Sequence, residues 1–270
     1  MSVAWRARLA VAPALLLVSV LFGGALAGAV RTSLVPLGGD ASLDVWRALF
    51  DDPAFWASVR FTLRITVLAT VLSAGLAVAL TLALRGRSTL QRTLVALPVP
   101  VPHLLVAATA VLWLAPGGLA DRALGGLPVD LVRDRHGLGI VLVYVYKETP
   151  FLALLLLAAT GRALAEREEA AAVLGAGPWQ RVRWVVWPTV RGPLVLGSLI
   201  VAAFVLGAFE VPLLVGPNAP STVAEYAQQA TTGDLIAGEG TAAAALLTTA
   251  VAAMVLAVGA VRVARTGEER

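Results

Sequence analysis

Long apolar segments separated by polar stretches set the pattern of this chain. Six of these segments carry few or no charged residues. Each is about 20 residues long, the length at which an α-helix crosses the hydrocarbon core of a bilayer. Their apolar positions run on continuously and do not alternate with polar ones, which favours membrane-spanning helices. The predicted spans cover approximately residues 9–30, 65–84, 94–115, 137–160, 193–215 and 241–261.

Composition agrees with this pattern. The 270 residues are 59% hydrophobic and only 14% charged, and the mean hydropathy of +0.84 is far above that of a soluble globular domain. The sequence therefore predicts an all-α membrane protein with six transmembrane helices in one domain, residues 1–270. The chain has no cysteine, which excludes disulfides and thiolate metal sites.

The first apolar run, residues 9–30, allows two interpretations. Ala25-Leu26-Ala27 resembles the small-residue cleavage site of a secretory signal peptide. The apolar run continues past that site, however, so we predict a first span that is retained.

A distinctive polar stretch between two spans is residues 163–188, ALAEREEAAAVLGAGPWQRVRWVVWP. Its first half is rich in strong helix formers. Gly175 and Gly177 can adopt the left-handed conformation that ends a helix, and Pro178 suits the first turn of the next one. Pro188 is expected to close that second helix. We therefore predict two short helices joined by a glycine elbow, and call residues 163–188 the elbow.

The spacing inside the elbow resembles the EAA loop of permease subunits in bacterial binding-protein-dependent ABC importers. In that family the loop sits in a groove of the ATPase subunit. One departure is Trp187, where the family usually has Leu before the closing proline. The match is long and position-specific, so it is a stronger signal than a three-residue motif. Its residues are Glu169-Ala170-Ala171, three residues, Gly175, nine residues, apolar Val185, one residue, and Trp187-Pro188.

The residue types suit a docking element. Ala170 and Ala171 have small side chains, so another protein can approach the helix backbone closely. Glu169 offers a carboxylate to a donor on that partner, and Gly175 lets the chain turn without a steric penalty. The resemblance implies that Glu169, Ala170, Ala171, Gly175 and Pro188 couple the chain to an ATPase, whereas an ordinary solvated amphipathic loop is the alternative.

The resemblance also implies a fold and a set of partners. It predicts the MetI-like permease arrangement of six spans, with a coupling loop at residues 161–192 and a mechanism of alternating access. The implied partners are two ABC ATPase subunits, a second permease that is a different chain, an extracytoplasmic solute-binding protein and membrane lipid, but no nucleic acid. No cofactor or metal is expected. The only lysine is in Tyr146-Lys147-Glu148, which cannot form a P-loop, so ATP hydrolysis is expected on a separate subunit.

Charge placement predicts the orientation in the membrane. Six spans put both termini on one side, together with the elbow. That side holds 13 of the 21 basic residues but only 5 of the 17 acidic ones. A basic excess marks the cytoplasmic face. We therefore predict a multi-pass protein of the bacterial inner membrane with both termini and the elbow in the cytoplasm.

Prolines and charges interrupt some of the spans. Pro98, Pro100 and Pro102 break the start of the third span, in an LPVPVP pattern that resembles the same span of the permease family. His103 follows, and we expect it to form a helix-to-helix hydrogen bond. Trp46 and Trp56, in the polar stretch before the second span, are candidate anchors at the membrane surface.

Lys147 and Glu148 lie inside the fourth span, where uncompensated charges are costly. They line a substrate path or gate, or they form salt bridges between helices, for example with Glu210; both interpretations stand. Glu210 lies in Gly207–Gly216, which resembles the fifth-span signature of polyamine-, iron- and thiamine-type permeases. Some of those proteins carry an acid two positions earlier, where this chain has Ala208, so the substrate stays open.

Other functional classes are less compatible with the sequence. A membrane protease lacks support because His-Glu-x-x-His, Gly-x-Ser-x-Gly and cysteine are all absent. A receptor or scaffold without transport activity is the principal alternative, with an elbow that binds a partner other than an ATPase. A proton-coupled transporter would work without any ATPase.

Overall fold

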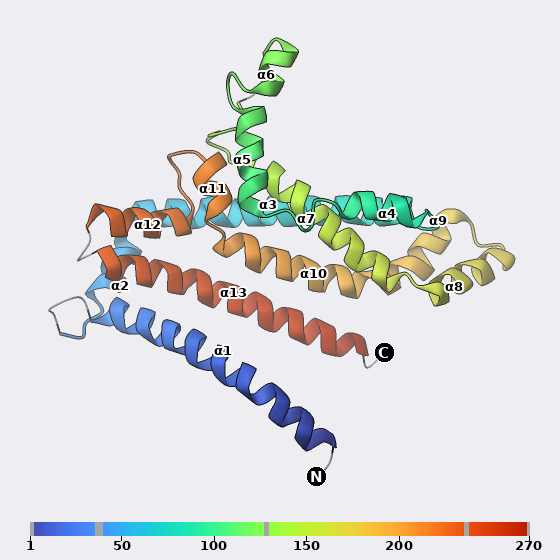
Figure 1. Ribbon diagram of the computed structural model, residues 1–270, viewed down its shortest axis with the longest axis horizontal. Helices are drawn as coiled ribbons and strands as arrows, with labels where there is room; N and C mark the ends of the chain where they lie inside the picture. The colour runs from blue at the N-terminus through green and yellow to red at the C-terminus, as the bar shows by residue number, and fades with distance from the viewer. Residues whose placement is uncertain (1–2, 36–39, 127–129, 235–237, 269–270) are drawn as a thin grey trace. The chain divides into compact units, whose positions relative to one another are not determined.

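The computed structural model describes residues 3–35, 40–126, 130–234 and 238–268, and regular structure in this part of the chain is entirely helical. The chain forms two compact units, which Figure 1 draws in one view. The first contains Met1–Trp56 and Tyr226–Thr248, and the second contains Ala57–Glu225 and Thr249–Arg270.

The first unit is built on α1 (Val3–Leu34) and α2 (Asp44–Asp51). It also takes in the start of α3 (Pro53–Leu84), most of α12 (Val223–Gly233) and the start of α13 (Gly238–Glu268). A cluster of aromatic rings joins these pieces, with centroids 5.6–6.1 Å apart for its neighbouring pairs. Its members are Trp46, Phe50, Phe55, Trp56 and Tyr226.

Hydrogen bonds fix the polar atoms of this aromatic cluster. The Trp56 indole donates to the Phe50 carbonyl at 2.8 Å, and the Tyr226 hydroxyl donates to the Asp52 carboxylate at 2.6 Å. Burial, reinforced by Asp52, raises the pKa of Tyr226. Of the two tryptophans that the sequence proposes as surface anchors, Trp56 thus packs the first turn of α3 against α2. Trp46 packs on Phe50 within α2 and donates to the Ser33 hydroxyl of α1 at 3.3 Å.

The second unit is organised around α7 (Leu138–Ala159). In its most apolar window 61% of the residues are buried, against 28% or less in each of the other candidate spans. Its buried side chains pack against α3, α5 (His103–Leu114), α10 (Trp187–Gly207) and α11 (Glu210–Val215). A Cβ at Gly197 of α10 would lie 2.6 Å from Leu155 of α7. The absent side chain therefore permits the close helix contact that small residues provide in membrane proteins.

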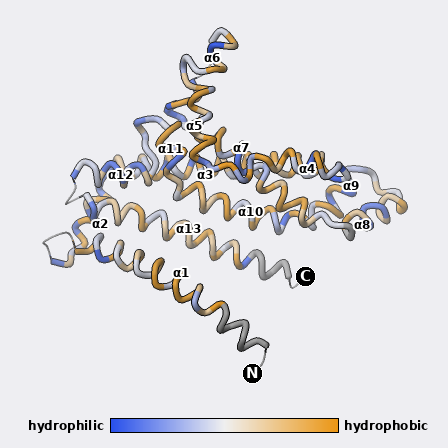
Figure 2. The backbone as a smooth tube through the Cα atoms, in the orientation of Figure 1, coloured by the Kyte–Doolittle hydropathy of each residue, from blue (hydrophilic) through white to orange (hydrophobic). Residues whose placement is uncertain are grey.

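Within the described ranges, six helical segments are long and apolar enough to cross a membrane, as the sequence predicts. Figure 2 shows their hydrophobic colouring along α1, α3, α7, α10 and α13. The fourth predicted span, 137–160, agrees with α7 to within a residue at each end. Shorter helices occupy the connections: α6 (Leu119–Leu124) lies between the third and fourth predicted spans, and α12 lies between the fifth and the sixth.

The third predicted span, 94–115, is interrupted near its start, as its prolines predict. The chain forms α4 (Thr89–Ala96) and α5, with a break between them at residues 97–102. The N–H groups of the break donate only to carbonyls three residues back, as from Val99 N–H to Ala96 O at 3.0 Å and from Val101 N–H to Pro98 O at 3.3 Å. The cause is that three of its six residues are prolines, which donate no hydrogen bond.

The fifth predicted span, 193–215, also differs. Its helix ends at Gly207, and Ala208 and Phe209 separate it from α11. Glu210 therefore begins a new short helix and does not lie near the end of a continuous one.

Pro188 does not close the second helix of the elbow, contrary to the prediction. Residues 178–207 continue through α9 (Pro178–Arg181), a π-helical turn (Val182–Val186) and α10. In that turn the Trp187 N–H bonds to the Val182 carbonyl, one residue further back than in an α-helix. The wider turn lets the helix accommodate a proline that would otherwise break it.

Candidate functional site

The elbow begins with α8 (Arg162–Val173) and turns sharply after it. Gly175 has φ +87°, in the left-handed region that favours glycine. Its N–H bonds to the Ala172 carbonyl at 3.0 Å, and the Ala176 N–H bonds to the Ala171 carbonyl at 2.9 Å. This pair of bonds is a Schellman motif, which satisfies the last carbonyls of a helix. The predicted glycine elbow is confirmed as a local structure.

The second helix of the elbow has its own start signal. Gly177 is the N-cap residue and Pro178 occupies the first turn. The Gln180 side chain accepts a hydrogen bond from the Gly177 N–H at 2.8 Å. Proline in the first turn costs nothing, because its missing N–H would be unpaired there in any case.

One face of α8 is fixed to the rest of the second unit. Leu164 is 4% exposed and belongs to the core. Arg85, just after α3, donates from one guanidinium nitrogen to both oxygens of Glu168 at 2.7 Å. The two side chains are 22% and 21% exposed, so the ion pair is partly shielded from solvent. These contacts attach α8 to the end of α3.

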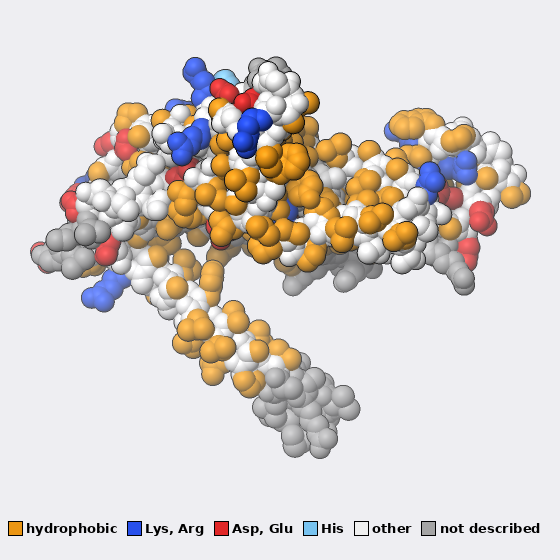
Figure 3. Space-filling model, turned by 45° about the horizontal axis from the view of Figure 1, so that its top comes forward, with side chains coloured by type: hydrophobic (Ala, Val, Ile, Leu, Met, Phe, Trp, Pro, Cys, Tyr) orange, Lys and Arg blue, Asp and Glu red, His pale blue; other side chains and the backbone are white. Residues whose placement is uncertain are grey.

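The opposite face and the tip of the elbow are open. Glu169 is exposed and forms no hydrogen bond or ion pair with any residue that the structure describes. Exposed apolar side chains surround the turn: Val173 at 88%, Leu174 at 87%, Trp179 at 72% and Trp184 at 70%. Figure 3 shows hydrophobic side chains among charged ones at the end of the second unit that carries the elbow. Apolar side chains concentrated on a polar loop mark an interaction surface.

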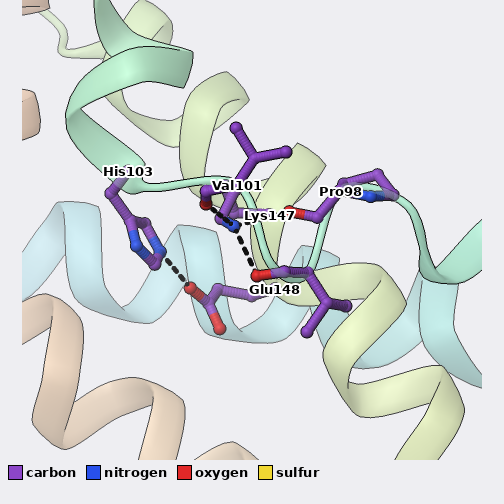
Figure 4. Close-up of polar contacts among 6 residues, drawn as sticks. Pro98, Val101, His103, Lys147 and Glu148 are labelled. Atoms are coloured by element: carbon purple, nitrogen blue, oxygen red, sulfur yellow. Dashed lines mark hydrogen bonds and ion pairs between the residues drawn. The ribbon is translucent and has the colours of Figure 1, made fainter.

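The charged residues of α7 lie opposite the break in the third span. The Lys147 ammonium donates to the carbonyls of Pro98 at 2.6 Å, Val99 at 3.1 Å and Val101 at 2.5 Å. Figure 4 shows its side chain directed at this loop of backbone. Glu148 turns to the other side, where one carboxylate oxygen lies 2.9 Å from Nε2 of His103. Lys147 is 3% exposed and Glu148 is 7% exposed.

These contacts decide between the earlier alternatives only in part. His103 forms the expected helix-to-helix hydrogen bond. The suggested bridge to Glu210 is not formed among the described residues, where Glu210 is exposed in the first turn of α11. Phe204 of α10 packs on the His103 ring at 4.7 Å between centroids.

The comparison with protein families decides the class of this chain. The family described as "Binding-protein-dependent transport system inner membrane component" matches residues 72–265, well over half of the sequence. The chain belongs to this family. The match includes both the elbow and the charged pair of α7.

A curated relative supports the same assignment. The chain is 30% identical over 210 residues to the "Inner membrane ABC transporter permease protein YnjC" of Escherichia coli (strain K12). That alignment covers 76% of this chain but only 41% of the relative, so the chain spans less than half the length of that permease.

A solved structure supports the fold of this family member. It is described as the crystal structure of a bacterial ABC transporter involved in the import of the acidic polysaccharide alginate. The TM-score is 0.75 at 20% identity, over 97% of this chain and 96% of the other. At that identity the likeness concerns the fold alone.

Sequence reasoning located the elbow of this transport-system component but missed two sets of contacts. The Arg85–Glu168 pair joins residues far apart in the chain, and nothing local in the sequence indicates it. The partners of Lys147 are backbone carbonyls, which no side-chain motif reveals. A signal was nevertheless present, because the only lysine of the chain lies in the span that follows the proline-rich one.

Proposed function

We propose that this chain is the permease subunit of an ATP-driven, binding-protein-dependent importer, with ATP hydrolysis on separate ATPase subunits. Membership in the family and the lack of a P-loop in the sequence support this. The observation that carries the proposal is the elbow, an exposed helical turn tipped with apolar side chains.

Each elbow residue has a proposed role in coupling. Glu169 pairs with a donor on the ATPase, since the chain gives its carboxylate no partner among the described residues. Ala170 and Ala171 allow close backbone approach, and Gly175 fixes the angle between the two helices through its positive φ. Pro188 lies where the second elbow helix continues into α10, so movement of the elbow is passed directly to a membrane span.

The permease is proposed to act in a larger assembly. A second, different permease chain completes the translocation path by alternating access, and an extracytoplasmic solute-binding protein delivers the substrate. The basic excess on the elbow side supports a cytoplasmic position for the elbow and both termini. The exposed Glu210 and the buried pair Lys147 and Glu148 are proposed to lie along or beside the path. The whole of residues 1–270 then acts as one permease domain.

Co-purification tests the proposal. The tagged chain is purified from membranes that also contain the ABC ATPase encoded beside it. In Gly175→Val the β-branched side chain strains a residue at φ +87°, at a cost of roughly 1–3 kcal/mol, and we expect the ATPase to be lost. Gly192→Ala is the matched control, because its Cβ would meet nothing within 4 Å.

The outcomes separate the two functional classes. Loss of the ATPase in Gly175→Val but not in Gly192→Ala supports the importer. If the unmodified chain retains an unrelated partner and no ATPase, the receptor or scaffold alternative is correct. Transport that continues after removal of the ATPase contradicts ATP coupling altogether.

A further inference from the structure

The break at residues 97–102 divides the third span into two helical pieces with opposite polar ends. In a continuous helix the Pro98 carbonyl would accept a hydrogen bond from position 102, which is also a proline and has no N–H. The carbonyls of Val99 and Val101 likewise lie outside the regular helix pattern. Upstream, the break therefore ends in carbonyl oxygens, which carry partial negative charge. Downstream it ends at the first turn of α5, where free N–H groups carry partial positive charge.

Two adjacent residues of α7, Lys147 and Glu148, carry charges opposite in sign to the partial charges of these two ends. Lys147 places its ammonium among the three upstream carbonyls. Glu148 places its carboxylate on His103, the first residue of α5. Consecutive residues on a helix point about 100° apart, so one pair can address both sides of the break. The charge of Lys147 is thus compensated by carbonyls that the prolines leave free, and that of Glu148 by the His103 imidazole at the start of α5.

We propose that Lys147 and Glu148 are positioning residues that hold the third span in its broken form by neutralising its two ends. The broken form sets the position of α5. Side chains of α5 line an apolar groove of about 480 Å³ together with Leu142 and Tyr146 of α7. Only Thr160 and Gly161 separate α7 from α8. The break is therefore expected to move with the elbow during coupling. This part of the inference rests on the proposed function.

A double-mutant cycle on the full-length chain tests the positioning role without any ATPase or substrate. Lys147→Met keeps the length of the side chain and removes its charge. We expect hydrogen–deuterium exchange at residues 99–106 to accelerate about tenfold, since one charge-assisted contact set is lost. Lys147→Arg restores a cation at the same place and should restore slow exchange.

The second arm of the cycle removes the prolines. In the triple variant Pro98→Ala, Pro100→Ala and Pro102→Ala, the new N–H groups can satisfy the helix carbonyls directly. Lys147→Met in that background should accelerate exchange by only about a third as much or less, because its partners no longer depend on it. An equal effect in both backgrounds overturns the inference and places Lys147 elsewhere in the mechanism.

Glu148→Gln keeps the test decisive if Lys147→Met does not fold. This variant retains an acceptor for His103 but loses the charge. We expect faster exchange confined to the first turn of α5, and unchanged exchange there contradicts the proposal. None of these measurements uses the ATPase. Failure of the importer assignment would therefore remove only the coupling step, and failure of the cycle would leave the importer assignment intact.

Discussion

The elbow and the break in the third span are both polar interruptions of an apolar chain. They differ in whether their charged side chains find partners within the chain. At the break, Lys147 and Glu148 find their partners within the chain and are almost fully buried. At the elbow, Glu169 has no partner among the described residues, and Val173 and Leu174 are almost fully exposed. The polar groups of the break are satisfied within the chain, whereas the elbow presents an exposed surface, which we propose is completed by a partner.

This difference predicts that substitutions in the two regions separate stability from coupling. The strongest effect is expected for Lys147→Met, which leaves three carbonyls without their charged donor. Removing one partner of a buried ionic contact costs on the order of 3 kcal/mol. The measurement is thermal unfolding of the purified chain in detergent. Glu169→Gln, at the exposed position, should unfold like the unmodified chain, and an equal loss for both variants would erase the distinction.

The next effect concerns binding and leaves stability alone. Leu174→Asp adds a charge at a side chain that is 87% exposed. We expect roughly tenfold weaker binding of the ATPase, in the range of interface anchors, with unfolding free energy unchanged within about 0.5 kcal/mol. Titration of the ATPase onto the reconstituted permease measures the affinity. Leu124→Asp on α6, where the leucine is 72% exposed, is the control and should bind normally.

A smaller effect is expected where the elbow is fixed to the rest of its unit. Arg85→Met breaks the 2.7 Å pair with Glu168, whose partners are about one-fifth exposed. Such a pair contributes about 1 kcal/mol or less. Hydrogen exchange of α8 should accelerate, and the charge swap Arg85→Glu with Glu168→Arg should reverse the change. Acceleration that the swap leaves in place would show that Arg85 acts by packing instead of charge.

The smallest effect is a pH dependence outside the membrane spans. Burial raises the pKa of Glu225 above its ordinary value of 4.5, although hydrogen bonds from Thr222 oppose the shift. A raised pKa favours the protonated folded state, so this contribution to stability is complete below pH 4.5 and is lost as pH rises through the folded-state pKa. Glu225→Gln should remove this part of the pH profile. Glu166→Gln, at an exposed site of α8, should retain it; identical profiles for both variants would contradict the assignment.

The sequence predicts what depends on local chemistry. Apolar runs locate six spans because lipid requires continuous hydrophobic length. The turn at Gly175 is also readable, because a left-handed helix end needs a residue without Cβ. The elbow lies between two spans and is exposed, so its residues obey local rules.

Features that depend on distant contacts were not readable. The π-helical turn before Pro188 is one example, because the sequence offers a proline as a stop and the wider turn absorbs it. The contacts of Lys147 with the break at 97–102 are another, since the lysine lies 46–49 residues away from the carbonyls that it binds. The outcome for Glu148 could not be derived either, because its partner His103 is on a different helix and the register between helices is set by tertiary packing.

The account depends most directly on the elbow being the surface that an ATPase contacts. Because the chain has no cysteine, a single cysteine at position 174 can be cross-linked specifically. Membranes containing Leu174→Cys and the ATPase encoded beside it are treated with a short thiol-to-amine reagent, with Leu124→Cys as the control. We predict one adduct, between the 27.9 kDa permease and the ATPase, from position 174 only. No ATPase adduct from position 174, together with one from position 124, would contradict it.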